Sequence, residues 1–472
     1  MVFQIIIIFC NIIHTMSVML PREINYTQLP VSLPQGVTTY DVALRPINGS
    51  SWSCQQAGSQ VQFDLPSRSG YMDGKTLSLS YKYTTASGVA TRIRCTPFYT
   101  PISRLEVLFG SQTAQNIPNY NVTMNMLTQL KFSVADKIGS ITGYGWGLEQ
   151  TAVEAPLNLS QISTTAMTLA GCDGRVLQAN EIGTFYGPLN CLLSQADKFI
   201  PLGMMPQVRV QLTLDSIANI FSSTAVVAND GFSQSTPLQT ASTGAVPADF
   251  VLSDFVLGYT HVDMGPEIDS SVRAMGDKLV IKSESFTSAA NTLPIGSVGQ
   301  VELLYSQKLA SIKSLFLHCS SNATGCANGI FDAFEVLGTG DLQFNIASKL
   351  YPSTRPLSPL IQNRGTLLLE LKKAISSLYD TKSGMSIAPQ EFINIAKDTS
   401  VHNPAKCYYG INCQQLQSNG VLLSGVSSQN TPISARLNIS TALTKTVSAL
   451  LISCFDVLIE IDPTNRDALI RQ

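Results

Sequence analysis

The segment Gln429–Asn465, QNTPISARLNISTALTKTVSALLISCFDVLIEIDPTN, decides the fold class of this chain. It contains two runs rich in apolar and β-branched residues, Ile433–Ile439 and Ala449–Ile461, which a Thr- and Ser-rich connection joins. Such runs predict strands, and the Asp462-Pro463 that follows ends the second one because proline cannot donate to a sheet ladder. The segment therefore predicts the closing strands of a β-domain.

A similar ending occurs near the middle of the chain. Phe250–Met264, FVLSDFVLGYTHVDM, is another β-rich run, and Gly265-Pro266 follows it directly. A chain that closes a β-domain twice is expected to contain two β-domains, so we place their boundary near Gly265-Pro266. Strands from one half would suffice for a β-sandwich of ordinary size.

Most of the remaining chain has the pattern of short strands between clusters of Gly, Pro, Ser and Asn. The predicted strands are Tyr40–Leu44, Gln60–Leu65, Thr76–Tyr83, Arg104–Phe109, Val208–Leu214, Phe250–Val262, Lys278–Ser283, Gln300–Tyr305, Ser314–His318 and Asp341–Ile346. Helical spacing of apolar residues predicts one main helix in each half, at Asn119–Ile138 and Gly365–Tyr379. Long loops are expected at Ser222–Pro247 and Ser383–Gly420, as contact arms or outward towers.

The composition favours surfaces that meet other subunits. The chain has 472 residues, of which 44% are hydrophobic and only 13% are charged, and its net charge is −2. Interface cores are depleted in charge, and uncharged polar residues suit sheets with one solvated face. No Lys/Arg-rich block occurs, so direct nucleic-acid binding is not expected.

The N-terminus and the cysteines carry little functional signal. Val2–Ile13 is apolar but too short to span a bilayer, and Met16 follows it closely, so residues 1–15 are not expected to belong to the fold. We interpret the scattered cysteines as buried small hydrophobic residues of a protein in a reducing compartment. They are Cys10, Cys54, Cys95, Cys172, Cys191, Cys319, Cys326, Cys407, Cys413 and Cys454.

Motifs for catalysis or cofactor binding are incomplete. Gly70–Thr76 ends like a phosphate-binding loop, but its spacing is one residue short and a hairpin turn is favoured. Gly143, Gly145 and Gly147 alternate with aromatic residues, which favours a turn over a nucleotide loop. No Gly-x-Ser-x-Gly elbow occurs.

The ionisable residues also lack the spacing of a known site. His261 is expected to be a structural histidine, and His14 to lie outside the fold. His318 and His402 have cysteines nearby, yet neither spacing matches a zinc site, although a structural metal stays open as an alternative. Solvated or inter-subunit roles are expected for Asp254, Asp456 and Glu460. The sequence thus predicts no catalytic residue, no cofactor-binding residue, no metal ligand and no enzymatic activity.

Several segments together resemble the major capsid proteins with a double jelly roll, the hexon-like lineage of virophages, nucleocytoplasmic large DNA viruses, adintoviruses and polinton-like elements. Leu342–Leu357, LQFNIASKLYPSTRPL, resembles a strand and its Tyr-Pro-x-x-Arg-Pro turn. Ser424–Ile433 and Phe455–Arg466 resemble segments near the end of these proteins. Leu105–Leu127 and Lys198–Asp215 resemble parts of the first jelly roll.

The resemblance implies an all-β fold of two consecutive jelly-roll β-sandwiches with a few short helices. Residues 16–265 would form the N-terminal jelly roll and residues 266–472 the C-terminal one. It implies a structural major capsid protein that forms pseudo-hexagonal homotrimeric capsomers tiling an icosahedral virion shell, assembled inside the host cell. The implied partners are the chain itself, neighbouring capsomers, and penton and minor capsid proteins. An internal membrane is compatible with the resemblance, but the chain would not span it.

Two other functions are compatible with a chain of many strands. One is another β-sandwich virion protein or a surface adhesin or lectin, which would need disulfides and glycosylated sequons. The other is a glycoside-processing enzyme on a β-sandwich, which would need paired carboxylates in a cleft lined by aromatic residues. The chain has only two tryptophans, Trp52 and Trp146, so sugar-stacking platforms are scarce.

Overall fold

Buried and half-exposed residues alternate along many strands of this protein. The buried positions of Val208–Leu214, for example, are Val208, Val210, Leu212 and Leu214, as expected for a strand with one face on a core. The computed structural model describes residues 37–53, 57–85, 91–94, 96–132, 175–177, 182–222, 250–274, 278–321, 329–331, 333, 339–353, 355–358, 364–376, 407–415, 423–440, 442–443 and 446–472. Thr38–Gln472 forms one compact unit, and the fold below is that of this unit.

The first half contains the strands β1 (Thr38–Leu44), β2 (Ser51–Ser53), β3 (Gln60–Leu65), β4 (Tyr71–Thr85), β5 (Thr91–Ile93), β6 (Ile102–Phe109), β7 (Gln112–Pro118), β8 (Arg175–Leu177), β9 (Ile182–Pro188), β10 (Val208–Leu214), β11 (Phe221–Ser222) and β12 (Phe250–Asp263). Its helices are α2 (Tyr120–Lys131), α6 (Ile217–Ile220) and the 3₁₀ turn η3 (Leu202–Met204). The two main sheets have the orders β1-β12-β4-β9 and β3-β10-β6-β7.

The second half follows α7 (Pro266–Ala274). It contains β13 (Leu279–Leu293), β14 (Gly299–Tyr305), β15 (Ile312–Ser321), β16 (Thr339–Ile346), β17 (Lys349–Tyr351), β18 (Tyr409–Asn412), β19 (Ile433–Ile439), β20 (Val447–Asp462) and β21 (Asp467–Arg471), with the helix α8 (Arg364–Ser376) and the turn η4 (Gly329–Phe331). Its sheets have the orders β13-β20-β15-β18, with β21 on β20, and β14-β19-β16-β17.

The two halves repeat one topology. When the short strands β2, β5, β8, β11 and β21 are left out, eight described strands remain in each half, and we number them one to eight in chain order. The first, eighth, third and sixth strands form one sheet, which is β1-β12-β4-β9 in the first half and β13-β20-β15-β18 in the second. The second, seventh, fourth and fifth strands form the other sheet, and every pairing within these main sheets is antiparallel. This is the two-sheet order of a jelly roll. The protein is therefore an all-β double jelly roll with a few short helices, as the sequence predicts, and we call the halves sandwich 1 and sandwich 2.

The repetition extends into a connection. In each sandwich the chain between the sixth and seventh strands returns to the third strand and forms an isolated antiparallel bridge there. The bridge joins Met72 to Ile200 in sandwich 1 and Ile312 to Val426 in sandwich 2. The two sandwiches are thus built alike beyond their strand order.

Aromatic packing closes the core of sandwich 1. The ring of Tyr81 stacks on Phe255 at a centroid distance of 4.9 Å, and its hydroxyl donates a hydrogen bond of 2.5 Å to the carbonyl of Phe98. The ring of Tyr83 packs edge-on against Phe185 at 4.8 Å. Large buried side chains of this kind each contribute about 1.5–3 kcal/mol of burial free energy. Because the Tyr81 hydroxyl donates its hydrogen bond, it is not left as an unpaired polar group in the core.

The structure confirms most predicted elements and corrects several. Both predicted helices exist, but α2 and α8 end at Lys131 and Ser376. Phe132 is already extended, and the predicted residues 133–138 and 377–379 lie outside the described part. Gly70–Thr76 is not a hairpin turn, because Tyr71–Thr76 already belongs to β4. The predicted loop Ser383–Gly420 contains β18. The predicted loop Ser222–Pro247, beyond Ser222 itself, and Gly143–Gly147 lie outside the described residues.

Two glycines should be irreplaceable because backbone lies against their Cα atoms. A Cβ on Gly74 would meet the carbonyl oxygen of Leu193 at 1.9 Å, and one on Gly425 would meet that of Ile312 at 2.1 Å. We expect Gly74→Ala and Gly425→Ala each to lower the free energy of unfolding by about 3 kcal/mol or more, since backbone cannot rotate away. Gly365→Ala, where nothing lies within 4 Å, is the control, and chemical denaturation measures all three. Equal stability of the three variants would contradict this packing.

Candidate functional site

Sandwich 1 contacts sandwich 2 along the edge strand β13. Ser283 Oγ donates to the carbonyl of Leu192 at 2.6 Å, and Gln115 Nε2 donates to Ser285 Oγ at 2.8 Å. Gln115 Oε1 in turn accepts a bond of 2.7 Å from the backbone N–H of Leu192. Serines on β13 thus fasten the second sandwich to β7 and to the 189–207 connection of the first, and we call this contact the seam.

Two further contacts extend the seam along β13. Asp197 and Lys282 exchange two bonds: the N–H of Asp197 donates to the carbonyl of Lys282, and the N–H of Lys282 donates to Asp197 Oδ1, each at 2.9 Å. Farther along the strand, Ser288 Oγ donates to the carbonyl of Pro118 at 2.8 Å. An edge strand carries unpaired backbone groups, and the seam satisfies part of them with sandwich 1.

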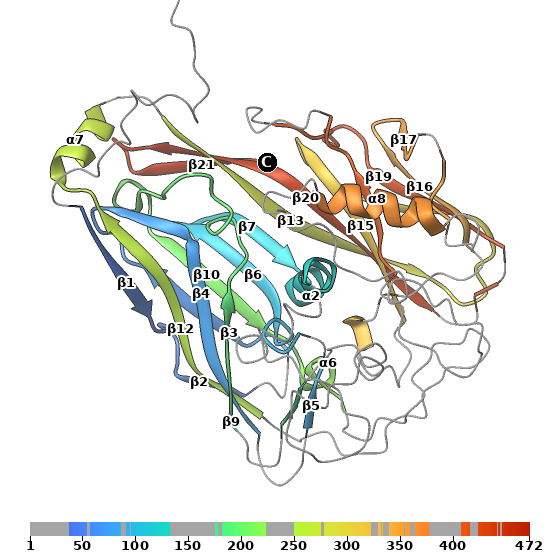
Figure 1. Cartoon of the computed structure of the whole chain (residues 1–472), viewed down its shortest axis with the longest axis horizontal. Helices are drawn as coiled ribbons and strands as arrows, with labels where there is room; N and C mark the ends of the chain where they lie inside the picture. Colours follow the sequence, from blue (N-terminus) through green and yellow to red (C-terminus); the bar gives the residue numbers. More distant parts are fainter. Residues whose placement is uncertain are drawn as a thin grey trace, which may run out of the picture. The chain divides into compact units, whose positions relative to one another are not determined.

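Helix α2 is packed into this region on all sides. Every residue from Tyr120 to Leu130 is buried, which is unusual for a helix that contains five Asn, Thr and Gln side chains in its first ten residues. Asn121 Nδ2 donates to Asp215 Oδ2 at 2.8 Å and so supplies a buried polar partner. Figure 1 shows α2 between the strands of the two halves. The helix therefore contributes buried surface to the seam as well as to sandwich 1.

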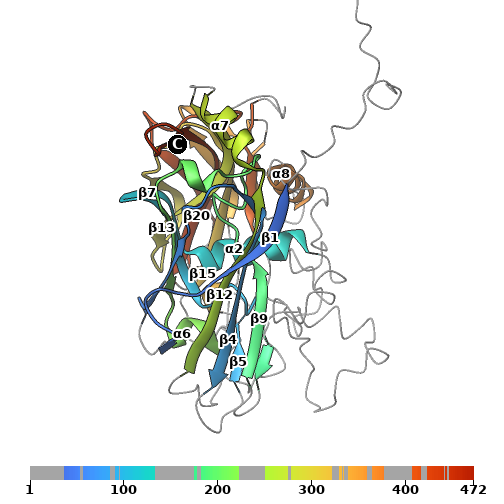
Figure 2. The ribbon, with the colours of Figure 1, turned by 90° about the vertical axis from the view of Figure 1, so that its left-hand side faces the viewer.

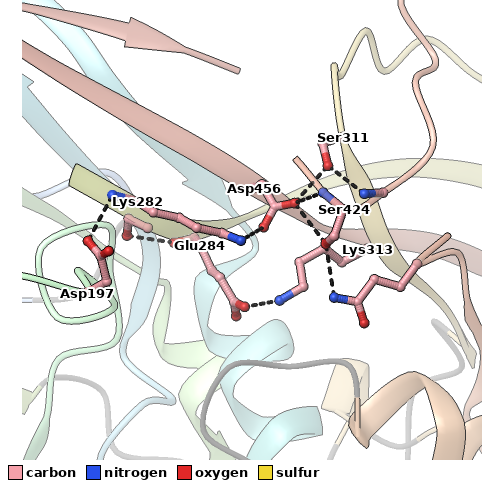
Figure 3. A network of polar contacts seen from close by, with 10 residues as sticks. Asp197, Lys282, Glu284, Ser311, Lys313, Ser424 and Asp456 are labelled. Atoms are coloured by element: carbon pink, nitrogen blue, oxygen red, sulfur yellow. Dashed lines mark hydrogen bonds and ion pairs between the residues drawn. The ribbon is translucent and has the colours of Figure 1, made fainter. Parts of the chain in front are cut away.

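Four ionisable side chains meet on β13, β15 and β20 beside the seam (Figure 3). Glu284 of β13 lies directly opposite Asp456 of β20 in the antiparallel register. The register of β15 on β20 shifts between Ile312 and Ser314, so Lys313 occupies a bulge. Bulges re-aim side chains, and here the bulge brings the ammonium of Lys313 to Glu284. We call Lys282, Glu284, Lys313 and Asp456 the buried charge cluster.

Asp456 is the centre of this cluster and is fully buried. Its Oδ2 accepts hydrogen bonds from Ser311 Oγ at 2.8 Å, from the N–H of Ser424 at 2.9 Å and from Ser424 Oγ at 3.2 Å. Its Oδ1 lies 3.7 Å from Lys282 Nζ, an ion pair without a direct hydrogen bond. The carboxylate thus joins β13, β20 and two connections of sandwich 2 at one point.

Lys313 and Glu284 form the second, more enclosed pair. Their side chains are only 5% and 4% exposed, and Figure 3 shows them pointing at each other. Burial lowers the pKa of the Lys313 ammonium, but neighbouring negative charges, with Glu284 foremost, outweigh burial and raise that pKa overall. The lysine therefore stays charged, and its charge is compensated inside the protein. Removing one member of such a pair typically costs about 3–5 kcal/mol.

The arrangement holds strands and connections of sandwich 2 together. Each ionised group of the cluster is engaged by a partner from another strand or connection, and the cluster lies under β20, which is buried on both faces from Ala449 to Ile459. Groups of three or more His, Cys, Asp or Glu residues that could hold a metal do not occur among the described residues. Within the same residues, no helix is long and apolar enough to cross a membrane.

The histidines that attracted attention in the sequence lie apart. His261 is buried, and its Nε2 is 3.0 Å from the carbonyl oxygen of Ser69. His318 is buried with its Nε2 2.9 Å from the carbonyl oxygen of Ile330, and its ring stacks on Tyr408. His14 and His402 lie outside the described residues.

The described cysteines are buried and free, in agreement with their interpretation as small hydrophobic residues. They are Cys191, Cys319, Cys407, Cys413 and Cys454. Burial raises the pKa of the Cys191 thiol to about 11 and that of Cys319 to about 12, so neither is a reactive thiolate at neutral pH.

The three carboxylates predicted to be solvated or at subunit contacts differ from one another. Asp254 is exposed and forms an ion pair of 2.8 Å with Lys82. Glu460 is largely buried between Lys278 and Arg471, at 3.8 and 2.8 Å. For Asp456 a solvated role is wrong, because it is fully buried and is bound by Ser311, Ser424 and Lys282. The sequence signal that marks it is a lone carboxylate inside the apolar run LLISCFDVLIEI.

A double-mutant cycle should reveal the Lys313–Glu284 pair. We expect Lys313→Met to lower the free energy of unfolding by about 3–5 kcal/mol, because it removes the cation that compensates Glu284. Glu284→Leu should cost a similar amount. The double variant should be less destabilised than the sum of the two by more than about 2 kcal/mol. Strict additivity in denaturant titrations would show that the two side chains do not interact.

His318 should make the protein sensitive to acid. Burial lowers its pKa from 6.5 to about 4, so the unfolded chain takes up this proton before the folded one does. The contribution of His318 is therefore constant above pH 6.5 and becomes increasingly destabilising as pH falls from 6.5 to about 4. The total is about 3 kcal/mol at 1.36 kcal/mol per pH unit. Unfolding of His318→Phe should show a shallower acid dependence than the unchanged protein, and identical slopes would contradict the assignment.

Comparison with known proteins supports the fold from an independent direction. No protein-family model matches the chain, and no curated protein matches it in sequence. Solved structures do match: the Faustovirus major capsid protein has a TM-score of 0.57 at 8% identity, and the alignment covers 96% of this chain and 94% of that one.

Two further structures are similar. PBCV-1 VP54, fitted into a reconstruction of the virophage Sputnik, has a TM-score of 0.56 at 8% identity and covers 94% of this chain and 99% of its own. The Sputnik virophage structure has a TM-score of 0.55 at 13% identity, with coverages of 96% and 92%. Each alignment thus extends over both sandwiches. The chain has the double jelly-roll fold that is found in major capsid proteins of icosahedral viruses.

Proposed function

We propose that this chain is a structural major capsid protein of an icosahedral virion. The observation that carries the proposal is the duplicated eight-strand topology, together with a likeness to capsid proteins that spans nearly the whole length of both chains. A sandwich is a rigid body whose faces can pack against neighbours without covalent chemistry. The protein acts by occupying space and making contacts, and its charged groups serve those contacts.

The proposed assembly is a homotrimer that tiles the shell as a pseudo-hexagonal capsomer. Three chains with two similar sandwiches each present six similar bodies around one axis, so a trimer can fill a six-neighbour position. The small share of charged residues, 13%, supports large contacts between such bodies, because burying an unpaired charge is costly. Neighbouring capsomers and penton and minor capsid proteins are the proposed partners, and nucleic acid is not.

The proposed boundary between the sandwiches is Gly265-Pro266, with residues 16–265 in the N-terminal jelly roll and 266–472 in the C-terminal one. In support, β12 ends at Asp263, α7 begins at Pro266, and among the described strands no pairing joins β1–β12 to β13–β21. The exclusion of residues 1–15 from the fold stays a prediction, since they lie outside the described residues.

The purified chain should be a stable trimer. Light scattering coupled to size-exclusion chromatography should give three times the chain mass of 50.9 kDa, and electron microscopy should show particles with a six-lobed outline. Obligate interfaces typically bury more than about 2,000 Å², so the trimer should persist at micromolar concentration and in high salt. A chain that stays monomeric under all these conditions would refute the capsomer.

A further inference from the structure

The two sandwiches meet at a second place besides β13. The turn η4 belongs to the connection between the third and fourth strands of sandwich 2, and it packs both on β15 and on the helix α2 of sandwich 1. Phe331 and Ala333 of this connection are buried. In Figure 2, α2 lies next to the sheet that contains β13, β20 and β15. The described residues of the connection therefore link the helix of one sandwich to a main sheet of the other.

His318 of β15 binds η4 through its ring. Its Nε2 atom is 2.9 Å from the carbonyl oxygen of Ile330. Since a carbonyl only accepts hydrogen bonds, Nε2 carries the proton and Nδ1 keeps a lone pair. The same ring stacks on Tyr408 at a centroid distance of 5.7 Å, and the N–H of Cys407 donates to the carbonyl of Ala333 at 3.2 Å. The imidazole thus lies where η4, β15 and the residues before β18 meet.

The site of His318 fits a neutral ring and not a charged one. The side chain is buried, and among the described residues no hydrogen-bond partner reaches its Nδ1 atom. Protonation would turn Nδ1 into a donor and give the ring a positive charge. A buried donor without an acceptor and a buried charge without a partner are both costly. A second proton therefore favours any arrangement in which the ring reaches water.

The elements around the ring supply no compensating charge. On β20 the residue opposite His318 is Leu450, and η4 consists of Gly, Ile and Phe. Burial lowers the pKa of His318 to about 4, and the Ile330 bond is the only opposing cause. The other titratable groups on the described elements packed against β15 and η4 are Lys313 and Cys319 of β15, Cys407, Tyr408 and Tyr409 at β18, Cys454, Asp456 and Glu460 of β20, Arg364, Glu370, Lys372 and Lys373 of α8, and Tyr120 and Lys131 of α2.

The equivalent connection of sandwich 1 is held by groups that do not titrate in acid. It joins β4 to β6, and within it Thr96 Oγ1 donates to Asn125 Oδ1 of α2 at 2.8 Å. From the third strand it is bound by a tyrosine, since the Tyr81 hydroxyl donates to the carbonyl of Phe98 at 2.5 Å. A tyrosine hydroxyl, with an ordinary pKa of about 10, gains no charge in acid. The two copies of the fold thus hold the same connection by different chemistry.

We propose that His318 is an acid-sensitive catch: when the pH falls, the protonated ring leaves its site, and η4 detaches from β15 and from its place beside α2. Sandwich 1, with its tyrosine at the equivalent place, keeps its connection closed. The catch lies within one chain, so its test does not depend on the proposed capsomer. Its use in a shell rests on the proposed function: subunits that loosen at η4 in acid weaken the shell in an acidic compartment.

The pH dependence of the catch follows from the two environments of the ring. In the open state the ring titrates at the ordinary value of 6.5, and in the closed state at about 4. The opening equilibrium is therefore constant above pH 6.5, rises up to about tenfold per pH unit below it, and levels off near pH 4. Between about pH 7.5 and about pH 5 the open population should increase about 30-fold.

Thiol labelling measures the opening. Cys407 is buried next to the connection that carries η4, and Cys191 is buried in sandwich 1 as an internal reference. The full-length protein is first treated with N-ethylmaleimide at neutral pH to block accessible thiols, and then with a dithiodipyridine, which labels thiols in acid as well. Peptide mapping by mass spectrometry gives the labelling rate of Cys407 relative to Cys191. This ratio should rise about 30-fold between about pH 7.5 and about pH 5.

Two matched variants assign the response to one ring. In His318→Gln the side-chain amide can still donate to the carbonyl of Ile330 but takes up no proton, so the ratio should stay constant with pH. His261→Gln is the control, because His261 is also buried with its Nε2 near a backbone carbonyl, that of Ser69. It should respond to acid like the unchanged protein. Circular dichroism verifies that both variants are folded.

The shape of the pH profile keeps the test valid if His318→Gln does not fold. In the unchanged protein a ratio that rises below pH 6.5 and levels off near pH 4 supports the catch. Equal acceleration of Cys407 and Cys191 would mean that acid loosens both sandwiches together, and it overturns the proposal. A ratio that is independent of pH, or a rise that persists in folded His318→Gln, overturns it as well.

Discussion

The rest of the structure depends on the burial of β20 on both faces. A strand in an antiparallel sandwich ordinarily turns one face to solvent, but β20 pairs with β13, β15 and β21 and is enclosed from Ala449 to Ile459. Enclosure on both faces requires other elements to cover the sheet, and sandwich 1 and α8, which packs on β18 and β15, supply this cover. The arrangement of the two sandwiches within Thr38–Gln472 follows from this one requirement.

The buried charge cluster is best understood in that setting. Buried ion pairs contribute little net stability compared with apolar residues of the same size, yet they penalise any arrangement in which a partner is lost. Lys313 reaches Glu284 only through the bulge in β15, and Asp456 is satisfied only when Ser311 and Ser424 are both in place. We therefore interpret the cluster as a device for a single arrangement of strands. If the register between these β-strands shifted, a buried charge would lose its partner.

The sequence predicts the strands whose alternation is uninterrupted. Gln60–Leu65, Val208–Leu214 and Ile433–Ile439 have the predicted bounds because their apolar residues recur at every second position. Ile182–Pro188 was not predicted, since its glycines and its exposed Ile182 and Tyr186 obscure the alternation. The predicted strand Lys278–Ser283 covers only the first part of β13, because the later residues SFTSAANTL lack a regular alternation of apolar and polar side chains.

The buried charge cluster could not be predicted in the same way. Lys313 and Glu284 are far apart from Asp456 in the sequence, and only the strand order brings them together. A bulge that re-aims one lysine has no signature in a single chain. Asp456 alone is visible as a charge in an apolar run, but the run does not reveal whether solvent or a lysine compensates it.

The central position of each eighth strand has a consequence for how the protein is made. In both sandwiches the strand that is translated last among the eight, β12 or β20, lies between the first and third strands of its sheet. On a ribosome, β13 has no strand partner, and β15 lacks one of its two, until Val447–Asp462 has emerged. The nascent second sandwich therefore exposes apolar strand edges for most of its synthesis, a period in which such edges are prone to aggregate. Slow closure of these non-local pairings would make this protein a demanding client of the host's folding machinery.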